Sequence, residues 1–280
     1  MVKHHIPKTL KDALKILDTC DCYIMAGGTD LMVLKHRRSG LTPSFDRDVC
    51  YVANLKELQY IFEDEKGVHI GAGTKYIDIL YSDIVPELIK QIVEEIASPN
   101  IRNMATMAGN VANASPAGDS IVGLYLLDAE LELVSINGSR HVSVQDFIYG
   151  VRKIHREPNE LIKEIFIPHH DDLNTYWKKV GSRAAESISK ITFAGGYEIE
   201  DNKVKDLRMA FGSVGITVIR HREIEEKYIG MTVEEIHNNA DAIVNDMAQF
   251  VNPITDQRST KYYRLQVAKN ILKDFLLNIE

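Results

Sequence analysis

Cysteine is scarce in this chain, with three residues among 280. Cys20 and Cys22 form a Cys-x-Cys pair, and Cys50 stands alone. Iron–sulfur and zinc sites usually need about four ligands at workable spacing, so this set is too sparse for either. The neighbouring residues His4 and His5 cannot share a helix face and are expected in solvent. The sequence therefore predicts free thiols and no metal site on this chain.

Long apolar runs and an excess of positive charge are also absent. No stretch approaches the roughly 18 apolar residues of a membrane span. Residues 1–7 lack the apolar core of a signal peptide. The net charge is −7 at pH 7, which argues against binding to nucleic-acid phosphates. These absences predict a cytoplasmic protein with no membrane span and no nucleic-acid partner.

Familiar catalytic patterns are missing as well. The sequence has no Walker A motif, no HExxH motif and no readable Ser/His/Asp or Cys/His arrangement. Gly71-Ala72-Gly73 begins like a Rossmann fingerprint, but Tyr76 stands where the third glycine belongs. No catalytic side chain is therefore expected, and a bound cofactor is expected to carry the chemistry.

What remains is an ordinary globular composition with two unusual runs of small residues. Hydrophobic residues make up 45% of the chain, and its length suits one large domain or two. The first run covers 26–31, and the second covers 106–110 and continues through 113–119. Glycine lets the backbone approach a ligand closely, and successive N–H groups form an anion-binding nest. The two runs predict two loops that close on one large anionic ligand, such as a dinucleotide.

Periodicity and turn signals predict a mixture of helices and strands. Thr9 is a candidate N-cap before apolar residues at helical spacing. Asn137-Gly138 is a strong hairpin signal, and Thr232 begins a capping box with Glu235. Other expected elements are strands over 23–26, 49–52, 68–71 and 161–167, helices beginning at Leu31 and Pro86, an antiparallel pair over 191–199 and 204–212, and a C-terminal helix. A polar linker is expected over 169–172.

The ordered motifs of the chain resemble those of one family, the FAD-binding (medium) subunits of molybdenum hydroxylases. This is the xanthine dehydrogenase and carbon monoxide dehydrogenase flavoprotein family, and the resemblance runs nearly end to end. The matching segments are Ala26–Leu31, Ile70–Thr74, Ile96–Asn103, Thr106–Asn110, Ala114–Asp119, Glu164–Pro168, Lys179–Arg183 and Asp256–Arg264.

The resemblance implies an α+β fold with two domains. An FAD-binding domain over 1–170 is expected to hold two α/β subdomains of the PCMH-type flavin fold, at about 1–56 and 57–170. Residues 171–280 are expected to form a C-terminal domain of the carbon monoxide dehydrogenase flavoprotein type, with an antiparallel sheet and helices.

The resemblance also implies which residues bind FAD. Residues 24–31 are expected to wrap the pyrophosphate, with Thr106, Gly109 and Asn110 as the second wall. Asp119 is expected on the flavin side of the ligand, Ile162 against the isoalloxazine ring and Lys179 near that ring. The full expected set is Ile24, Met25, Ala26, Gly27, Gly28, Thr29, Asp30, Leu31, Ile96, Thr106, Ala108, Gly109, Asn110, Asn113, Ser115, Asp119, Ile162 and Lys179.

One residue departs from the family pattern. The family usually has Gly-Gly before Asn in the second motif, and this chain has Ala108-Gly109. If position 108 requires a positive φ, alanine is strained there by roughly 1 kcal/mol. We expect FAD binding to survive this change.

The function implied by the resemblance is electron transfer within a larger enzyme. FAD on this chain is expected to receive electrons from 2Fe–2S clusters on a small partner subunit and to pass them to NAD or another acceptor. Molybdopterin and the substrate pocket are expected on a large partner subunit. Two alternatives are a stand-alone flavin oxidoreductase of the vanillyl-alcohol-oxidase type and a non-catalytic binding protein on a degenerate flavin fold.

Overall fold

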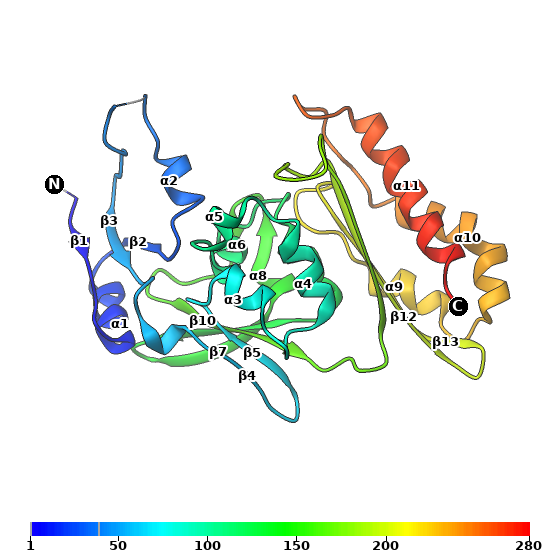
Figure 1. Cartoon of the computed structure of the whole chain (residues 1–280), viewed down its shortest axis with the longest axis horizontal. Helices are drawn as coiled ribbons and strands as arrows, with labels where there is room; N and C mark the ends of the chain where they lie inside the picture. The colour runs from blue at the N-terminus through cyan, green and yellow to red at the C-terminus, as the bar shows by residue number, and fades with distance from the viewer. Residues whose placement is uncertain (1, 39) are drawn as a thin grey trace. The chain divides into compact units, whose positions relative to one another are not determined.

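The computed structural model describes residues 2–38 and 40–280, and Figure 1 labels many of their elements. The chain divides into two compact units. The first holds residues 1–86, 98–114 and 128–169, and the second holds 87–97, 115–127 and 170–280. Both units combine helices with sheets, and the expected α+β class is confirmed.

A small parallel sheet lies at the beginning of the first unit. Its strands are β1 (His4–His5), β3 (Asp48–Tyr51) and β2 (Cys22–Met25), in that order. Helix α1 (Leu10–Thr19) begins where the Thr9 side chain accepts a hydrogen bond from the Asp12 amide at 3.1 Å. Its apolar face packs into a core shared with the sheet, because Ala13, Leu17, Cys22 and Cys50 are all buried.

A five-stranded antiparallel sheet forms the rest of the first unit's framework. Its order is β4 (Ile61–Glu63), β5 (Gly67–Gly71), β10 (Leu161–Pro168), β6 (Glu130–Ser135) and β7 (Gly138–Ser143). The predicted Asn137-Gly138 turn joins β6 to β7, and Gly138 has φ of +134°. Short elements complete the unit: α2 (Leu31–Leu34), η1 (Lys56–Leu58), α3 (Tyr76–Leu80), α5 (Pro99–Arg102), α6 (Met107–Asn113), α8 (Val144–Phe147), β8 (Ile148–Gly150) and β9 (Lys153–Ile154).

The second unit is built on a three-stranded antiparallel sheet, β11 (Asn174–Val180), β12 (Ile191–Glu200) and β13 (Lys203–Gly212). Helices α10 (Val233–Ala248) and α11 (Lys261–Leu277) lie together beside this sheet (Figure 1). A side chain at Gly195 of β12 would come within 2.6 Å of the Phe275 ring of α11, so glycine allows the helix to pack closely. The remaining helical turns here are α9 (Arg222–Glu225) and η2 (Glu226–Tyr228).

Two helices from earlier in the sequence also belong to the second unit. They are α4 (Glu87–Glu94) and α7 (Asp119–Leu126), and every residue of α7 is buried. A Cβ at Gly123 of α7 would lie 2.5 Å from Ile92, and a Cβ at Gly212 of β13 would lie 2.6 Å from Val122. Helix α7 is therefore packed between α4 and the sheet.

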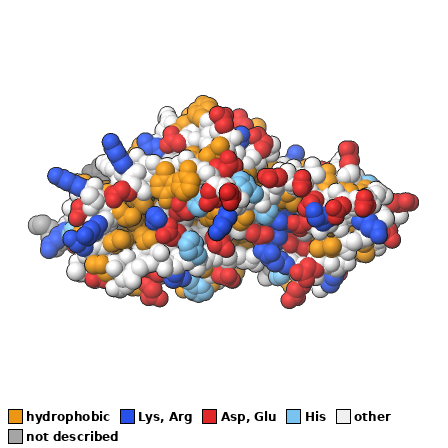
Figure 2. Space-filling view, turned by 90° about the horizontal axis from the view of Figure 1, so that it is seen from below, with side chains coloured by type: hydrophobic (Ala, Val, Ile, Leu, Met, Phe, Trp, Pro, Cys, Tyr) orange, Lys and Arg blue, Asp and Glu red, His pale blue; other side chains and the backbone are white. Residues whose placement is uncertain are grey.

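Most of the expected elements are present. The antiparallel pair is β12 and β13, and the Thr232 capping box begins α10 with both of its hydrogen bonds. The helix expected from Pro86 spans Glu87–Glu94, and the one expected at Leu31 is a single turn. Within the described residues, no helix is long and apolar enough to cross a membrane. On the face that Figure 2 presents, acidic and basic side chains are interspersed.

Candidate functional site

The first small-residue run forms a tight turn after a buried strand. Strand β2 ends at Met25, and Gly28 adopts φ of +70°, which favours glycine. The Gly28 carbonyl accepts a hydrogen bond from the Met32 amide at 2.9 Å, so the turn leads directly into α2. The run therefore lies in a loop between a strand end and a helix start.

Gly27 brings this turn against the segment that precedes the second run. A Cβ at Gly27 would lie 2.0 Å from the carbonyl oxygen of Met104 and 2.9 Å from the Cα of Ala105. These distances involve backbone atoms, which cannot rotate away. The first run is thus in direct backbone contact with the residues just before the second run, within the first unit.

The second run begins helix α6. The Thr106 side chain is its N-cap and accepts a hydrogen bond from the Gly109 amide at 3.0 Å. A bridge pairs Thr106 with Lys75, and the Tyr76 amide donates to the Ala105 carbonyl at 3.0 Å. The segment that follows β5 and leads to Tyr76 therefore also contacts the start of α6.

The start of α6 carries partial positive charge. The amides of Met107 and Ala108 belong to the first helical turn, which offers them no acceptor inside the helix. Gly109 is exposed, and among the described side chains only Thr106 Oγ1 lies within 4 Å of its would-be Cβ. This turn can therefore accept an anion at close range.

Ala108 is not strained. It is the second residue of α6, and its φ is not among the positive values of the chain. Alanine would cost stability here only with a positive φ, which Ala108 does not have. The helical conformation suits alanine better than glycine.

A buried ion pair lies in the second unit. Lys179 Nζ is 2.8 Å from Asp119 Oδ2, with 7% and 8% of the two side chains exposed. The Ser189 hydroxyl donates to Asp119 Oδ1 at 2.6 Å, and the Lys179 ammonium group donates to the carbonyl of Glu95 at 2.6 Å. Strand β11, the loop before β12, α7 and the residue after α4 thus hold this charged cluster together.

Burial is the largest influence on the Asp119 carboxyl and raises its pKa. The Lys179 ammonium group and the Ser189 hydroxyl act in the opposite direction. The charged form of Asp119 therefore depends on these two partners, since an unpaired carboxylate is costly in a buried place.

The expected site residues are divided between the two units. Residues 24–31, 106–113 and Ile162 lie in the first unit, where Ile162 is buried in β10 beside a bulge. Ile96, Ser115, Asp119 and Lys179 lie in the second unit. Ser115 makes a local turn, because its hydroxyl accepts from the Ala117 amide at 3.3 Å.

Several residues that support these clusters could not be identified from the sequence. Ser189 and the Glu95 carbonyl bind the Asp119–Lys179 pair, and the Met104 backbone supports the first turn. No local pattern distinguishes these residues. Their roles depend on long-range packing and on main-chain atoms, which any residue type supplies.

The N-cap of α6 yields a direct test of this geometry. Thr106→Val keeps the shape of the side chain but removes the acceptor for the Gly109 amide, so the free energy of unfolding should fall by about 1 kcal/mol. Thr106→Ser is the matched control and should stay close to the native value. Denaturant titration measures both, and a native-like result for the valine variant would contradict the capping role.

Two family descriptions cover nearly all of the chain. Residues 1–170 match "FAD binding domain in molybdopterin dehydrogenase". Residues 176–279 match "CO dehydrogenase flavoprotein C-terminal domain". The order of the two matches agrees with the order of motifs in the sequence.

Similar proteins match over nearly their full length. The glyceraldehyde dehydrogenase medium chain of Sulfolobus acidocaldarius is 34% identical, with 94% of this chain and 92% of the relative covered. The xanthine dehydrogenase FAD-binding subunit of Escherichia coli O157:H7 is 28% identical, with 96% and 93% covered. The structure of reconstituted CO dehydrogenase from Oligotropha carboxidovorans superposes with a TM-score of 0.88 at 25% identity, covering 98% and 96%.

Proposed function

This chain belongs to the family of FAD-binding subunits of molybdopterin dehydrogenases, and we propose that it passes electrons from iron–sulfur clusters of a partner subunit to NAD or another acceptor. FAD, when bound, supplies redox chemistry that can exchange electrons singly or in pairs. The protein's own residues hold this group and protect it from water. We propose no catalytic side chain on this chain.

The observation that carries the proposal is the meeting of the two small-residue loops in the first unit. The Gly27-Gly28 turn touches the segment before α6, whose first turn offers free amides. These residues fit the pyrophosphate of FAD, because two negative phosphates need several N–H donors and no bulky side chain nearby. We assign residues 24–31 together with Thr106, Ala108, Gly109 and Asn110 to this role.

The remaining expected residues are proposed from the family pattern. Ile162 supplies an apolar contact for the isoalloxazine ring, and Lys179 supplies positive charge near that ring. The Asp119 and Ser189 contacts support this role, because they hold the Lys179 ammonium group in one position. Ile96, Asn113 and Ser115 complete the proposed contacts.

We also propose partner subunits for this chain. The relatives named above are called a medium chain and an FAD-binding subunit, which are names for parts of larger enzymes. A large subunit with molybdopterin would hydroxylate the substrate, and a small subunit with 2Fe–2S clusters would deliver the electrons. No residue pattern in this chain supplies either of those centres.

Reconstitution with FAD tests the cofactor site. The purified chain, mixed with excess FAD and desalted, should retain about one flavin per chain by absorbance and calorimetry. Gly109→Val should weaken FAD binding by about 10-fold or more while the far-ultraviolet signal stays native, because a branched side chain narrows the open face of α6. Ala108→Gly is the control and should bind FAD at least as tightly. Normal affinity in the valine variant would move the pyrophosphate site elsewhere.

Electron transfer needs a separate measurement. The FAD-loaded chain alone should reduce an artificial dye from NADH if its acceptor is a nicotinamide. Substrate hydroxylation should require the molybdenum and iron–sulfur partners. A purified chain that oxidises a heterocycle without partners would favour the stand-alone flavin oxidoreductase.

A further inference from the structure

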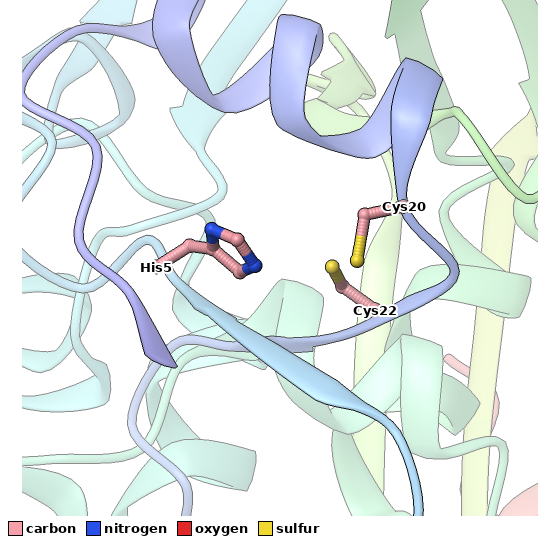
Figure 3. Close-up of side chains that lie close together, drawn as sticks. All are labelled: His5, Cys20 and Cys22. Carbon is pink, nitrogen blue, oxygen red and sulfur yellow. The ribbon is translucent and has the colours of Figure 1, made fainter. Parts of the chain in front are cut away.

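Three potential metal ligands gather at the edge of the N-terminal sheet, outside the proposed FAD site. One ligand atom from each of His5, Cys20 and Cys22 lies within 4.8 Å of the other two. Figure 3 shows the two sulfur atoms close together, with the His5 ring turned toward them. None of these three side chains takes part in the interactions described for the small-residue loops.

A carboxylate completes this group. Asp48 Oδ2 lies 3.1 Å from His5 Nε2 and 3.5 Å from Cys20 Sγ. Asp48 is also the direct strand partner of Cys22, because the two residues are paired in the β2–β3 register. Asp48 therefore contacts two of the three ligand residues, although it is not among the side chains whose ligand atoms all lie within 4.8 Å of one another.

We propose that His5, Cys20, Cys22 and Asp48 bind one zinc ion. Two sulfur atoms, one imidazole nitrogen and one carboxylate oxygen are ligands that zinc accepts in tetrahedral sites. With four protein ligands, the site is closed and has a structural role rather than a catalytic one.

The distances are compatible with such a site. Zinc bonds of about 2.0–2.3 Å place neighbouring ligand atoms about 3.3–3.8 Å apart in a tetrahedron. The two Asp48 distances, 3.1 and 3.5 Å, are close to that range. Three atoms no more than 4.8 Å apart can lie within about 2.8 Å of one point, so movements of under about 1 Å bring these three to bonding distance. The Asp48 carboxylate lies outside this group of three and needs a larger side-chain rotation to become the fourth ligand.

The surroundings favour a cation. Cys20 is the C-cap of α1, whose last turn contains no basic residue, and helix C-termini attract positive charge. Zinc would replace the protons of the two thiols, which are released as the thiolates bind. The side chains of His5 and Asp48 are 26% and 23% exposed, so an ion can enter from solvent.

The site would stabilise the weakest part of the sheet. Strand β1 has two residues and pairs with β3 at only two positions. A zinc ion bound to His5 of β1, Asp48 of β3 and Cys22 of β2 would join all three strands. It would also brace β2, the strand that ends at the first small-residue turn.

The adjacent cysteine provides a matched control. Cys50 is fully buried in the core shared by α1 and the sheet, and burial raises the pKa of its thiol to about 11. It lies one residue after Val49, two positions from Asp48, yet its sulfur is not part of the ligand group. Cys50→Ala therefore perturbs the same sheet without removing a proposed ligand.

The test is a metal analysis of the full chain, purified under reducing conditions and exchanged with zinc and then with cobalt. We expect about one zinc per chain by mass spectrometry of the metal. The cobalt form should show thiolate-to-metal charge-transfer absorption and the strong visible bands of a tetrahedral site. Cys20→Ser and Cys22→Ser should lose the metal and these bands, and Asp48→Asn should weaken zinc binding about 10-fold or more. Cys50→Ala should keep the metal.

Other results would overturn the proposal. The site is absent if the chain binds less than a tenth of an equivalent of zinc, shows no cobalt bands and keeps the same melting temperature when zinc is added. A mass lower by two hydrogens under the same reducing conditions would show that two of the three thiols pair with each other instead. If the cysteine variants fail to fold, His5→Gln answers the question, because loss of zinc with a native far-ultraviolet signal supports the site and full retention contradicts it.

Discussion

Gly27→Ala is expected to separate the two loops of the proposed pyrophosphate site. The new Cβ would lie 2.0 Å from the Met104 carbonyl oxygen, and the backbone on both sides would have to move. We expect the free energy of unfolding to fall by about 3 kcal/mol or more, because main-chain atoms cannot relieve such a clash by rotation. FAD binding should be lost or weakened by at least about 100-fold.

Denaturant titration and FAD calorimetry measure the two effects of this substitution. Gly150→Ala is a suitable control, because Gly150 is buried but the atoms nearest to its Cβ would belong to the Lys153 side chain, at an ordinary 3.4 Å. The control should stay near native stability and keep FAD. Native-like stability and FAD affinity in Gly27→Ala would show that the loops do not approach each other this closely.

Lys179→Met should be the second most damaging change. It leaves the Asp119 carboxylate buried without its cation, and breaking a buried pair in this way costs about 3–5 kcal/mol. Lys178→Met is the neighbouring control and should have little effect, because Lys178 is exposed. The double variant Asp119→Asn with Lys179→Met should recover part of the loss, since it removes the unpaired charge.

The loss in Lys179→Met should depend on pH. Burial raises the pKa of Asp119, and removing the lysine removes an influence that lowers it. In the variant, Asp119 therefore takes up a proton more readily in the folded state than in the unfolded state. The destabilisation should be smallest in mild acid and should grow as the pH rises past the unfolded value of about 3.9. A loss that stays constant from about pH 3 to 8 would show that the carboxylate is not the source.

Local features of this fold could be predicted from sequence. The Asn137-Gly138 turn, the Thr9 N-cap and the Thr232 capping box each depend on a few neighbouring residues, and all are present. The two small-residue runs were identified as loops because glycine and helix starts have recognisable patterns. That they touch could not be predicted, since the contact at Gly27 depends on the main chain of Met104.

Clusters that are assembled from distant segments could not be predicted from the sequence. His5, Cys22 and Asp48 approach one another only after three parallel strands align, so the Cys-x-Cys pair alone indicated ordinary thiols. Ser189 similarly reaches Asp119 across 70 positions of sequence. The positions of α4 and α7 in the second unit also depend on their packing partners, which the hydrophobic periodicity of each helix does not indicate.

The early position of α4 and α7 in the sequence of the second unit has a consequence for biosynthesis. Both helices leave the ribosome before the strands of the sheet against which α7 is buried. A growing chain must therefore keep the apolar surface of α7 uncovered until residues 174–212 have been made. Residues 87–97 and 115–127 cannot reach their final packing ahead of that sheet, and a gene cut near residue 170 would separate the sheet from helices that complete its core. The second unit is therefore not one continuous stretch of sequence, although the motif order suggests consecutive modules.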